Sequence, residues 1–398
     1  MTTAAAHPPG IVVRGRLVLP DRCADGELEA AGGKIVRITR RSPAGTSPIE
    51  PIRGADCPIR TLPPNQYVIP GFIDLHTQGF AGIDLSMVDD ASVPRMASAM
   101  LTAGITSYVA TLGYTPDVLE RVLPYVNADV PGARMLGLYF EGPFINPRRM
   151  GAIPAKYCLP PDPAKLAAIL ERAQGRIKLM TVAPELDGSL ELIKMLRVGG
   201  VVPAIGHTLA TYSQAMRGID AGIRHTTHLF NAMTGLSHRE PGAAGAALSA
   251  RQVSIEIIAD GVHVHPAVIN LAISLKGPEK VAAITDAAPA AGLDTSQPLT
   301  LLGAVVSVVD GAPRLPDGTL AGSLLTPIVA LRNLVMLAGI PIHVAVQMLT
   351  LTPAEIISVD HAKGSIAEGK DADLAIIDDD FNLHAVFVGG WPLWQAKT

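Results

Sequence analysis

The chain has 398 residues, of which 48% are hydrophobic and 17% charged, and its net charge is -4. This length can hold a barrel of about 250 residues together with a smaller domain. No run of lysine or arginine stands out, so no nucleic-acid or membrane-surface partner is expected. The apolar stretches are interrupted by Gly, Pro or His before they reach about 20 residues, so none is expected to cross a bilayer.

The N-terminus and the cysteines predict a cytoplasmic protein. The opening residues, MTTAAAHPPG, lack the basic and apolar regions of a secretory signal. Cys23, Cys57 and Cys158 are an odd, scattered set without CxxC spacing. This pattern is typical of reduced thiols and not of a disulfide framework.

Both ends of the chain read as short strands. Residues 11–19 (IVVRGRLVL) and 26–39 (GELEAAGGKIVRIT) are strand-like near the start, and 371–394 near the end contain two more strand-like pieces. Because chain termini often lie close together, these pieces are expected to form one small domain. The expected division is a β-sandwich of residues 1–66 and 359–398 around a barrel of residues 67–358.

Between the ends, apolar strand-like runs alternate with segments of helical spacing such as DPAKLAAILERAQ. Continuously apolar strands in a βα repeat predict a closed parallel (β/α)8 TIM-like barrel, whose strands are buried on both faces. A doubly wound open sheet is the alternative, but the GxGxxG loop that would favour it is absent after the first strand. The expected strands lie in residues 68–76, 104–112, 133–143, 177–185, 199–207, 222–230, 254–264 and 280–288.

Ionisable residues stand at or just after the ends of six of these runs. In a barrel, the carboxyl ends of the strands share one rim, where the active site is built. Side chains that are distant in sequence would therefore meet in one cavity and could hold a metal ion. His225 precedes His228 by three positions, so on a strand it points to the other side and is expected to be packed or solvated. The residues at the rim are His76, Glu141, His207, His228, His263 and Asp286.

The motifs of the chain resemble those of the amidohydrolase superfamily, and within it the N-acetylglucosamine-6-phosphate deacetylase family. The motifs cover nearly the whole chain in the expected order: PGFIDLH, YFEGPFINP, TVAPE, AIGHTLATY, THLFNAM, REPGAAG, IIADGVHVHP, ITDAAP, TLAGSLLT and KGSIAEGKDADLAIID. The resemblance implies a barrel with a β-sandwich built from both termini, in a homodimer.

The resemblance also implies the metal centre. Glu141, His207 and His228 match the family's ligands, and Asp286 matches its catalytic aspartate. Two imidazoles and one carboxylate suit a catalytic zinc-like site that leaves one position open. One divalent ion is expected, zinc first, with iron, cobalt or manganese as alternatives.

The stretch His76-Thr77-Gln78 departs from the superfamily's H-x-H pair, which holds a second metal. An amide oxygen is a poor ligand for a zinc-like ion compared with an imidazole. One tightly held ion is therefore expected, with His76 and Gln78 forming at most a weak second site.

Further positions match residues that contact the substrate. Arg239 matches the arginine that pairs with the sugar phosphate, either in its own subunit or in a neighbour, and a guanidinium suits that bidentate role. Ile153 stands where the family usually has a histidine, so one polar contact is expected to be missing. The other matching positions are Ala152, Asn231, Ala232, His263, Leu320, Ala321 and Gly322, whereas His265 is expected outside the site.

The implied reaction is metal-dependent hydrolysis of an N-acetyl amide, which converts N-acetylglucosamine 6-phosphate and water into glucosamine 6-phosphate and acetate. Because of Ile153, the alternative is a related amidohydrolase that deacetylates another N-acyl amine, such as an unphosphorylated or modified amino sugar or a secondary-metabolite intermediate. A catalytically silent barrel with a binding role is a third possibility. The combination of Glu141, His207, His228 and Asp286 argues against it.

Overall fold

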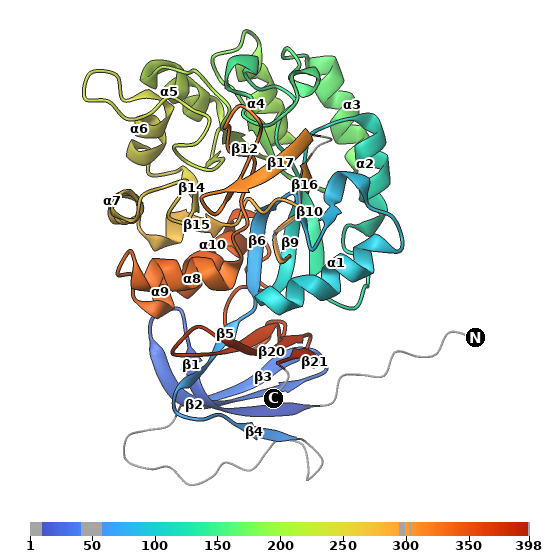
Figure 1. The fold of residues 1–398 in the computed structure, drawn as a ribbon, viewed down its shortest axis with the longest axis vertical. Coiled ribbons are helices and arrows are strands. Elements are labelled where there is room, and N and C mark those ends of the chain that lie inside the picture. The colour runs from blue at the N-terminus through green and yellow to red at the C-terminus, as the bar shows by residue number, and fades with distance from the viewer. Residues whose placement is uncertain (1–9, 41–57, 294–298, 302–303, 397–398) are drawn as a thin grey trace.

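The computed structural model describes residues 10–40, 58–293, 299–301 and 304–396. Figure 1 shows two parts, a larger body of strands and helices and a smaller body built almost entirely of strands. Cys57 and the residues 1–9 of the N-terminus lie outside the described residues. Cys23 and Cys158 are both free thiols.

The larger body is a parallel barrel. Its strands pair in chain order, and the described part of the chain contains eight of them. The last strand returns to the first, since Thr77 and Ala287 form a parallel bridge and the Asp286 amide donates to the His76 carbonyl at 2.9 Å. The expected barrel is therefore confirmed. The strands are β6 (Phe72–Thr77), β9 (Ile105–Leu112), β10 (Arg134–Phe140), β11 (Ile177–Val182), β12 (Val202–Ile205), β13 (His225–Thr226), β14 (Ser254–Ile258) and β15 (Val281–Ile284).

Burial on both faces explains why these sequences form barrel strands. Every residue of β9 and every residue of β14 is buried, as expected for strands between a filled barrel interior and an outer ring of helices. Thr115, Asp162 and Thr211 begin three of the helices with side-chain caps. The helices are α1 (Ser92–Met100), α2 (Pro116–Val122), α3 (Pro163–Ala173), α4 (Ser189–Val198), α5 (Tyr212–Ala221), α6 (Gly242–Ser249), α7 (Pro266–Lys276), α8 (Pro327–Met336), α9 (Ile342–Leu349) and α10 (Leu351–Ile356).

The smaller body is a strand-rich unit built from both ends of the chain, as expected. Its strands form one sheet in the order β21-β20-β19-β5-β1-β2-β3, with β4 paired to β1. The division of the chain at residues 66 and 358 stays a prediction. The strands are β1 (Ile11–Val18), β2 (Cys23–Ala31), β3 (Lys34–Arg40), β4 (Ile59–Thr61), β5 (Gln66–Pro70), β19 (Leu374–Asp378), β20 (Leu383–Val388) and β21 (Trp391–Gln395).

Gly71 connects the two bodies, because β5 of the terminal sheet runs through it into the first barrel strand, β6. A Cβ atom at this position would lie 2.2 Å from Cγ2 of Thr106. Glycine is therefore the residue that allows the two sheets to be joined so closely.

Two small antiparallel units were not anticipated from the sequence. A hairpin of β7 (Gly79–Phe80) and β8 (Ile83–Asp84) follows the first barrel strand, and β16 (Leu299–Leu301), β17 (Ala304–Val309) and β18 (Ala312–Arg314) follow the last. The segment after β18 returns to the barrel rim, where the Ser323 amide donates to the carbonyl of Asp286 at 2.7 Å. This insertion supplies one wall of the site described below.

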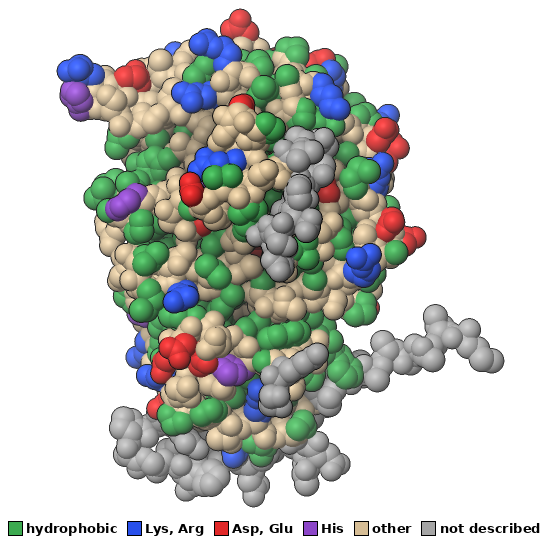
Figure 2. Space-filling view, in the orientation of Figure 1, with side chains coloured by type: hydrophobic (Ala, Val, Ile, Leu, Met, Phe, Trp, Pro, Cys, Tyr) green, Lys and Arg blue, Asp and Glu red, His purple; other side chains and the backbone are tan. Residues whose placement is uncertain are grey.

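The distribution of charges on the surface agrees with the absence of lysine or arginine runs in the sequence. On the face drawn in Figure 2, basic and acidic side chains are interspersed, and no extended basic area forms there. None of the helices in the described part of the chain has the length and apolarity needed to span a membrane.

Candidate active site

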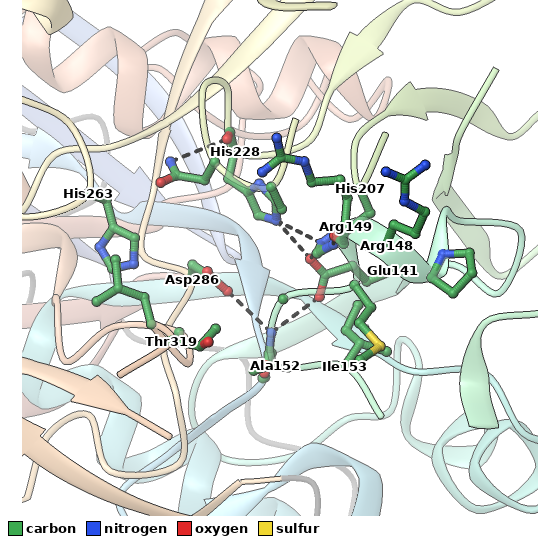
Figure 3. A pocket seen from close by; sticks show the side chains of 18 of the residues that line it. Glu141, Arg148, Arg149, Ala152, Ile153, His207, His228, His263, Asp286 and Thr319 are labelled. Carbon is green, nitrogen blue, oxygen red and sulfur yellow. Dashed lines mark hydrogen bonds and ion pairs between the residues drawn. The ribbon is translucent and has the colours of Figure 1, made fainter. Parts of the chain in front are cut away.

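A cavity of about 460 Å³ opens at the carboxyl ends of the barrel strands. Its walls come from the segments that follow β6, β10, β12, β13, β14 and β15, and from the loop after β18. Figure 3 shows Glu141, His207 and His228 in contact with one another, with Asp286 and His263 across the cavity from them.

Glu141, His207 and His228 meet at a single point. Oε1 of Glu141 lies 2.7 Å from Nε2 of His207 and 2.9 Å from Nε2 of His228, and the two imidazole nitrogens are 3.2 Å apart. All three residues are buried, and their donor atoms lie within 4.8 Å of one another. Two imidazole nitrogens and a carboxylate oxygen that converge in this way fit a divalent transition-metal ion.

Backbone conformation directs these side chains inward. His207, His228 and Asp286 have φ angles of 46°, 25° and 49°, respectively. Such left-handed angles are unfavourable for residues other than glycine and often occur at functional sites. Each of these residues follows the end of a barrel strand, so the turn of the chain places its side chain in the cavity.

Neighbouring groups determine which ring nitrogen of His207 carries a hydrogen, and they keep Glu141 ionised. Nδ1 of His207 lies 2.8 Å from the carbonyl oxygen of Arg149 and therefore donates a hydrogen to it, which leaves Nε2 free to act as a ligand. Burial alone would raise the pKa of Glu141, but the facing imidazoles, His207 first, hold the pKa of its carboxyl well below its usual range. The carboxylate is thus kept in the ionised form that binds a cation.

Glu256 is a buried carboxylate beneath the cluster that the sequence reasoning missed. It lies on β14 and accepts hydrogen bonds from the His76 ring at 3.0 Å, the His225 ring at 3.0 Å and the backbone amide of His228 at 2.9 Å. Burial would raise its pKa, but the charges of His76 and His225 lower it. The signal was one charged residue inside the otherwise uncharged strand SIEII, all of whose residues are buried. His225 is fully buried and also contacts the Ser254 hydroxyl at 2.7 Å.

His76 connects this carboxylate to Asp286. Its Nε2 lies 3.3 Å from Oδ1 of Asp286 and 3.9 Å from Oε2 of Glu141. Burial lowers the pKa of His76, but Glu256 and Asp286 outweigh burial and raise it to about 10. The imidazolium of His76 therefore faces the carboxylate of Asp286.

Asp286 is buried, and its surroundings favour proton transfer. Burial raises the pKa of its carboxyl, His76 opposes this shift, and the nearby Glu141 adds to it. A carboxyl with a raised pKa is a better base than an ordinary aspartate.

Gln78 lies between the two carboxylates. Its Nε2 is 3.3 Å from Oε2 of Glu141 and 3.3 Å from Oδ1 of Asp286, so the amide donates toward both. An amide N–H group offers no lone pair to a metal, so in this orientation Gln78 bridges the carboxylates through hydrogen bonds. The weak second site at His76 and Gln78 stays a prediction.

Most of the residues expected to contact the substrate line the cavity, whereas Ala321 and Arg239 do not. Those that line it are Ala152, Ile153, Asn231, Ala232, His263, Leu320 and Gly322. Ala321 is instead fully buried, against Ala288 in a small apolar cluster. Arg239 lies in the exposed stretch 235–240 and is not part of the wall.

His263 is oriented by a partner that the sequence reasoning did not name. Its Nδ1 lies 2.6 Å from Oδ2 of Asp260. Burial would raise the pKa of Asp260, but its hydrogen bond with His263 lowers it, so the carboxylate accepts from Nδ1. Arg148, Arg149, Asp317 and Thr319 also line the cavity and were not anticipated.

Comparison with known proteins defines the class. The sequence pattern of the amidohydrolase family matches residues 67–392, and the chain belongs to this family. The chain is 35% identical to the N-acetylgalactosamine-6-phosphate deacetylase of Escherichia coli O157:H7, over 82% of this chain and 87% of that protein. It is 34% identical to the N-acetylglucosamine-6-phosphate deacetylase of Bacillus subtilis, over 80% and 82%.

Solved structures agree with this relationship. The N-acetylglucosamine-6-phosphate deacetylase of Pasteurella multocida superimposes with a TM-score of 0.87 at 29% identity, covering 98% of this chain and all of that one. A mutant of the Mycobacterium smegmatis enzyme, in complex with N-acetyl-D-glucosamine-6-phosphate, gives 0.87 at 30% identity over the same shares. The expected relationship to this deacetylase family is confirmed.

Proposed function

We propose that this protein hydrolyses the acetamide of an N-acetylated amino-sugar 6-phosphate, with N-acetylglucosamine 6-phosphate as the first candidate. The products are glucosamine 6-phosphate and acetate. The observation that carries the proposal is the convergence of Glu141, His207 and His228 on one point, with Asp286 facing them across a cavity of about 460 Å³. The deacetylase relatives and the solved complex with the sugar phosphate support the substrate.

The cluster is proposed to hold one divalent cation, zinc first, with iron, cobalt or manganese as alternatives. When bound there, the cation would act as a Lewis acid and would lower the pKa of water toward neutrality.

The protein's own groups would move the protons. In the proposed mechanism, the Asp286 carboxylate accepts a proton from the attacking water and later gives it to the leaving nitrogen. His76 and Gln78 hold the Oδ1 atom of Asp286 in place. Asp260 accepts a hydrogen from Nδ1 of His263, so Nε2 of His263 would donate toward the carbonyl oxygen as part of an imidazolium that is paired with the Asp260 carboxylate. In that form, His263 would stabilise the negative charge that develops on the carbonyl oxygen.

A second candidate substrate is the C4 epimer, N-acetylgalactosamine 6-phosphate. The 35% identity to the Escherichia coli enzyme named for it supports this reading. Ile153 also supports a different set of sugar contacts, because it lines the cavity and its side chain cannot donate a hydrogen bond. The broader alternative, another N-acyl amine, rests on the same residue.

The quaternary structure and location form part of the proposal. Arg239 lies outside the cavity wall of its own chain, which fits a homodimer in which it serves the neighbouring subunit. The free thiols of Cys23 and Cys158 fit a reducing, cytoplasmic location.

A panel assay tests the function. Acetate release is measured with N-acetylglucosamine 6-phosphate, N-acetylgalactosamine 6-phosphate and the two unphosphorylated sugars. The proposal predicts turnover of at least one phosphosugar, with kcat/KM well above that of its unphosphorylated counterpart. No acetate from any of the four, with metal-loaded and folded protein, would contradict it.

A further inference from the structure

Glu185, in the TVAPE motif, is a carboxylate behind the cavity wall that has no part in the proposed mechanism. It follows barrel strand β11, is half-buried, and does not line the cavity. Its Oε1 atom accepts hydrogen bonds from Nδ2 of Asn146 at 2.9 Å and from the backbone amide of Leu209 at 2.6 Å. Its Oε2 atom accepts a hydrogen bond from the Thr208 hydroxyl. One carboxylate therefore receives three hydrogens from two separate segments of the chain.

These bonds form part of a closed ring around His207, one of the proposed metal ligands. The Asn146 amide donates to the His207 carbonyl at 2.9 Å, so Asn146 binds both Glu185 and the backbone of the ligand. The Arg149 amide donates to the Asn146 carbonyl at 2.8 Å, and Nδ1 of His207 donates to the Arg149 carbonyl at 2.8 Å. Glu185 is thus connected to His207 by two routes, through the turn that contains Asn146 and through the residue that follows the ligand.

The backbone of His207 needs such support. Its φ angle of 46° lies in the left-handed region, which is unfavourable for a residue with a Cβ atom. A conformation of this kind persists only when the surrounding contacts hold it in place. Glu185 binds the two residues that follow His207, and Thr208 is fully buried. The chain can therefore relax from this angle only by breaking hydrogen bonds that the charge of a carboxylate strengthens.

The same carboxylate supports the wall of the cavity. Asn146, which donates to Glu185, is also the N-cap of the turn Pro147–Arg149, and its side chain accepts from the Arg148 amide at 3.0 Å. The chain continues from this turn into the wall, and residues 147 to 153 all line the cavity. The ligand segment and the wall are therefore parts of one hydrogen-bonded unit, with Glu185 at its centre.

We propose that Glu185 is a positioning residue, which holds His207 and the cavity wall together in the geometry that binds the metal ion and the substrate. It touches neither of them and acts through Asn146, Thr208 and Leu209. This inference rests on the proposed function, since it concerns the same site.

The first test measures the zinc affinity of E185A and E185Q by competition with a chelator. Alanine removes all three hydrogen bonds, so the affinity of E185A is expected to fall about 10- to 100-fold, the range for residues that orient metal ligands. Glutamine keeps one acceptor oxygen for Asn146 and Leu209, but it turns an N–H group toward the Thr208 hydroxyl and carries no charge. E185Q should therefore bind zinc less tightly than the wild type and more tightly than E185A. Because it keeps the shape of the side chain, E185Q provides the test even if E185A does not fold.

A second test asks whether the effect is local. Hydrogen exchange at saturating zinc, followed by mass spectrometry, should become faster in E185Q over residues 144–153 and 206–212, with no change in barrel strand β9. A merely structural role would instead raise exchange in β9 as well, and would lower the free energy of unfolding while leaving the zinc affinity of the folded protein unchanged. That outcome would overturn the inference.

Asn146 tests whether the parts act as one unit. N146A and E185Q should each weaken zinc binding, and the loss in the double variant should be smaller than the product of the two single losses. Fully multiplicative losses would overturn the inference, because the two side chains would then act independently. D187N is the matched control, since Asp187 is an exposed carboxylate two residues after Glu185. D187N is expected to bind zinc as the wild type does.

Zinc affinity and hydrogen exchange need no substrate, so they separate this inference from the proposed function. Weaker zinc binding by E185Q, with faster exchange confined to the two segments, supports the inference even if no sugar of the panel is turned over. Wild-type zinc affinity in either folded variant of Glu185, or no zinc binding by the wild type, would overturn it.

Discussion

Asp286 combines the features expected of a proton-transfer group at the scale of single residues. It is buried, has a left-handed φ of 49°, and faces the imidazole of His76 at 3.3 Å. Burial raises the pKa of its carboxyl, with His76 opposing the shift. A strained backbone supported by several neighbours is typical of a residue kept for function and not for stability.

Replacing Asp286 with asparagine removes the base and keeps the size of the side chain. D286N is expected to lose about 10²- to 10⁴-fold in kcat, the usual contribution of a general acid–base group. Metal content should stay at the wild-type level, because Glu141, His207 and His228 are untouched. Acetate release and metal analysis of the same sample check both points. Near-normal turnover would refute the role of Asp286.

Glu256 supports the site without touching the cavity. Its carboxylate holds the rings of His76 and His225 and the backbone amide of His228. Partners of this kind orient ligands and tune metal affinity. Glu256 therefore acts as a positioning residue.

E256Q keeps the shape of the side chain and removes its charge. Metal affinity is expected to fall about 10- to 100-fold, and the free energy of unfolding by roughly 2–3 kcal/mol, because a charged acceptor is lost beside buried imidazoles. Competition with a chelator and denaturant unfolding measure the two effects. E171Q, at an exposed position of α3, is the control. Unchanged metal affinity in E256Q would show that Glu256 does not position the ligands.

At the scale of elements, the buried lysine Lys276 connects helices α6 and α7. Lys276 ends α7, is 8% exposed, and its ammonium donates to the carbonyls of Ala247 and Ala250 at 3.1 and 2.7 Å. These carbonyls belong to the end of α6, where the helix leaves its last carbonyl groups without helical partners. The lysine caps α6 and connects it to α7. Burial lowers the pKa of Lys276 to about 8, from an ordinary value of 10.5.

The direction of the resulting pH effect follows from this shift. Between about pH 8 and 10.5 the unfolded lysine binds more protons than the folded one, so this residue makes stability rise with pH in that window. At each pH, the free energy of unfolding of K276M is subtracted from that of the wild type. This difference is expected to increase by up to about 3 kcal/mol from pH 7 to pH 10. Denaturant unfolding at the two pH values checks this, with K194M on α4 as the exposed control. A difference that does not change with pH would contradict it.

The elements also show what the sequence could and could not predict. Most barrel strands were recognisable because burial on both faces favours an apolar run, as in β10 and β15. The short units β7–β8 and β16–β18 were missed because strands of two to six residues outside the βα repeat carry too little periodicity to be read. As a result, the pocket wall formed by Asp317 and Thr319 was not anticipated.

At the scale of the whole molecule, part of the site could be predicted from the barrel fold. Residues at the carboxyl ends of different strands must converge in a closed barrel, so Glu141, His207, His228 and Asp286 could be expected to meet. Glu256 was not found because it lies inside a strand and not at its end. Arg148 and Arg149 were not found because their place in the wall depends on how a loop folds, and loop conformation is not encoded by strand or helix periodicity.

The central claim concerns the whole protein: one cation, held by Glu141, His207 and His228, is required for amide hydrolysis. Metal analysis of the purified chain, coupled to acetate release from N-acetylglucosamine 6-phosphate before chelation, after it, and after metal is restored, tests this claim most directly. One ion per chain is expected, with activity that disappears on chelation and returns in proportion to the ion restored. Full activity in a folded protein stripped of metal would contradict the claim.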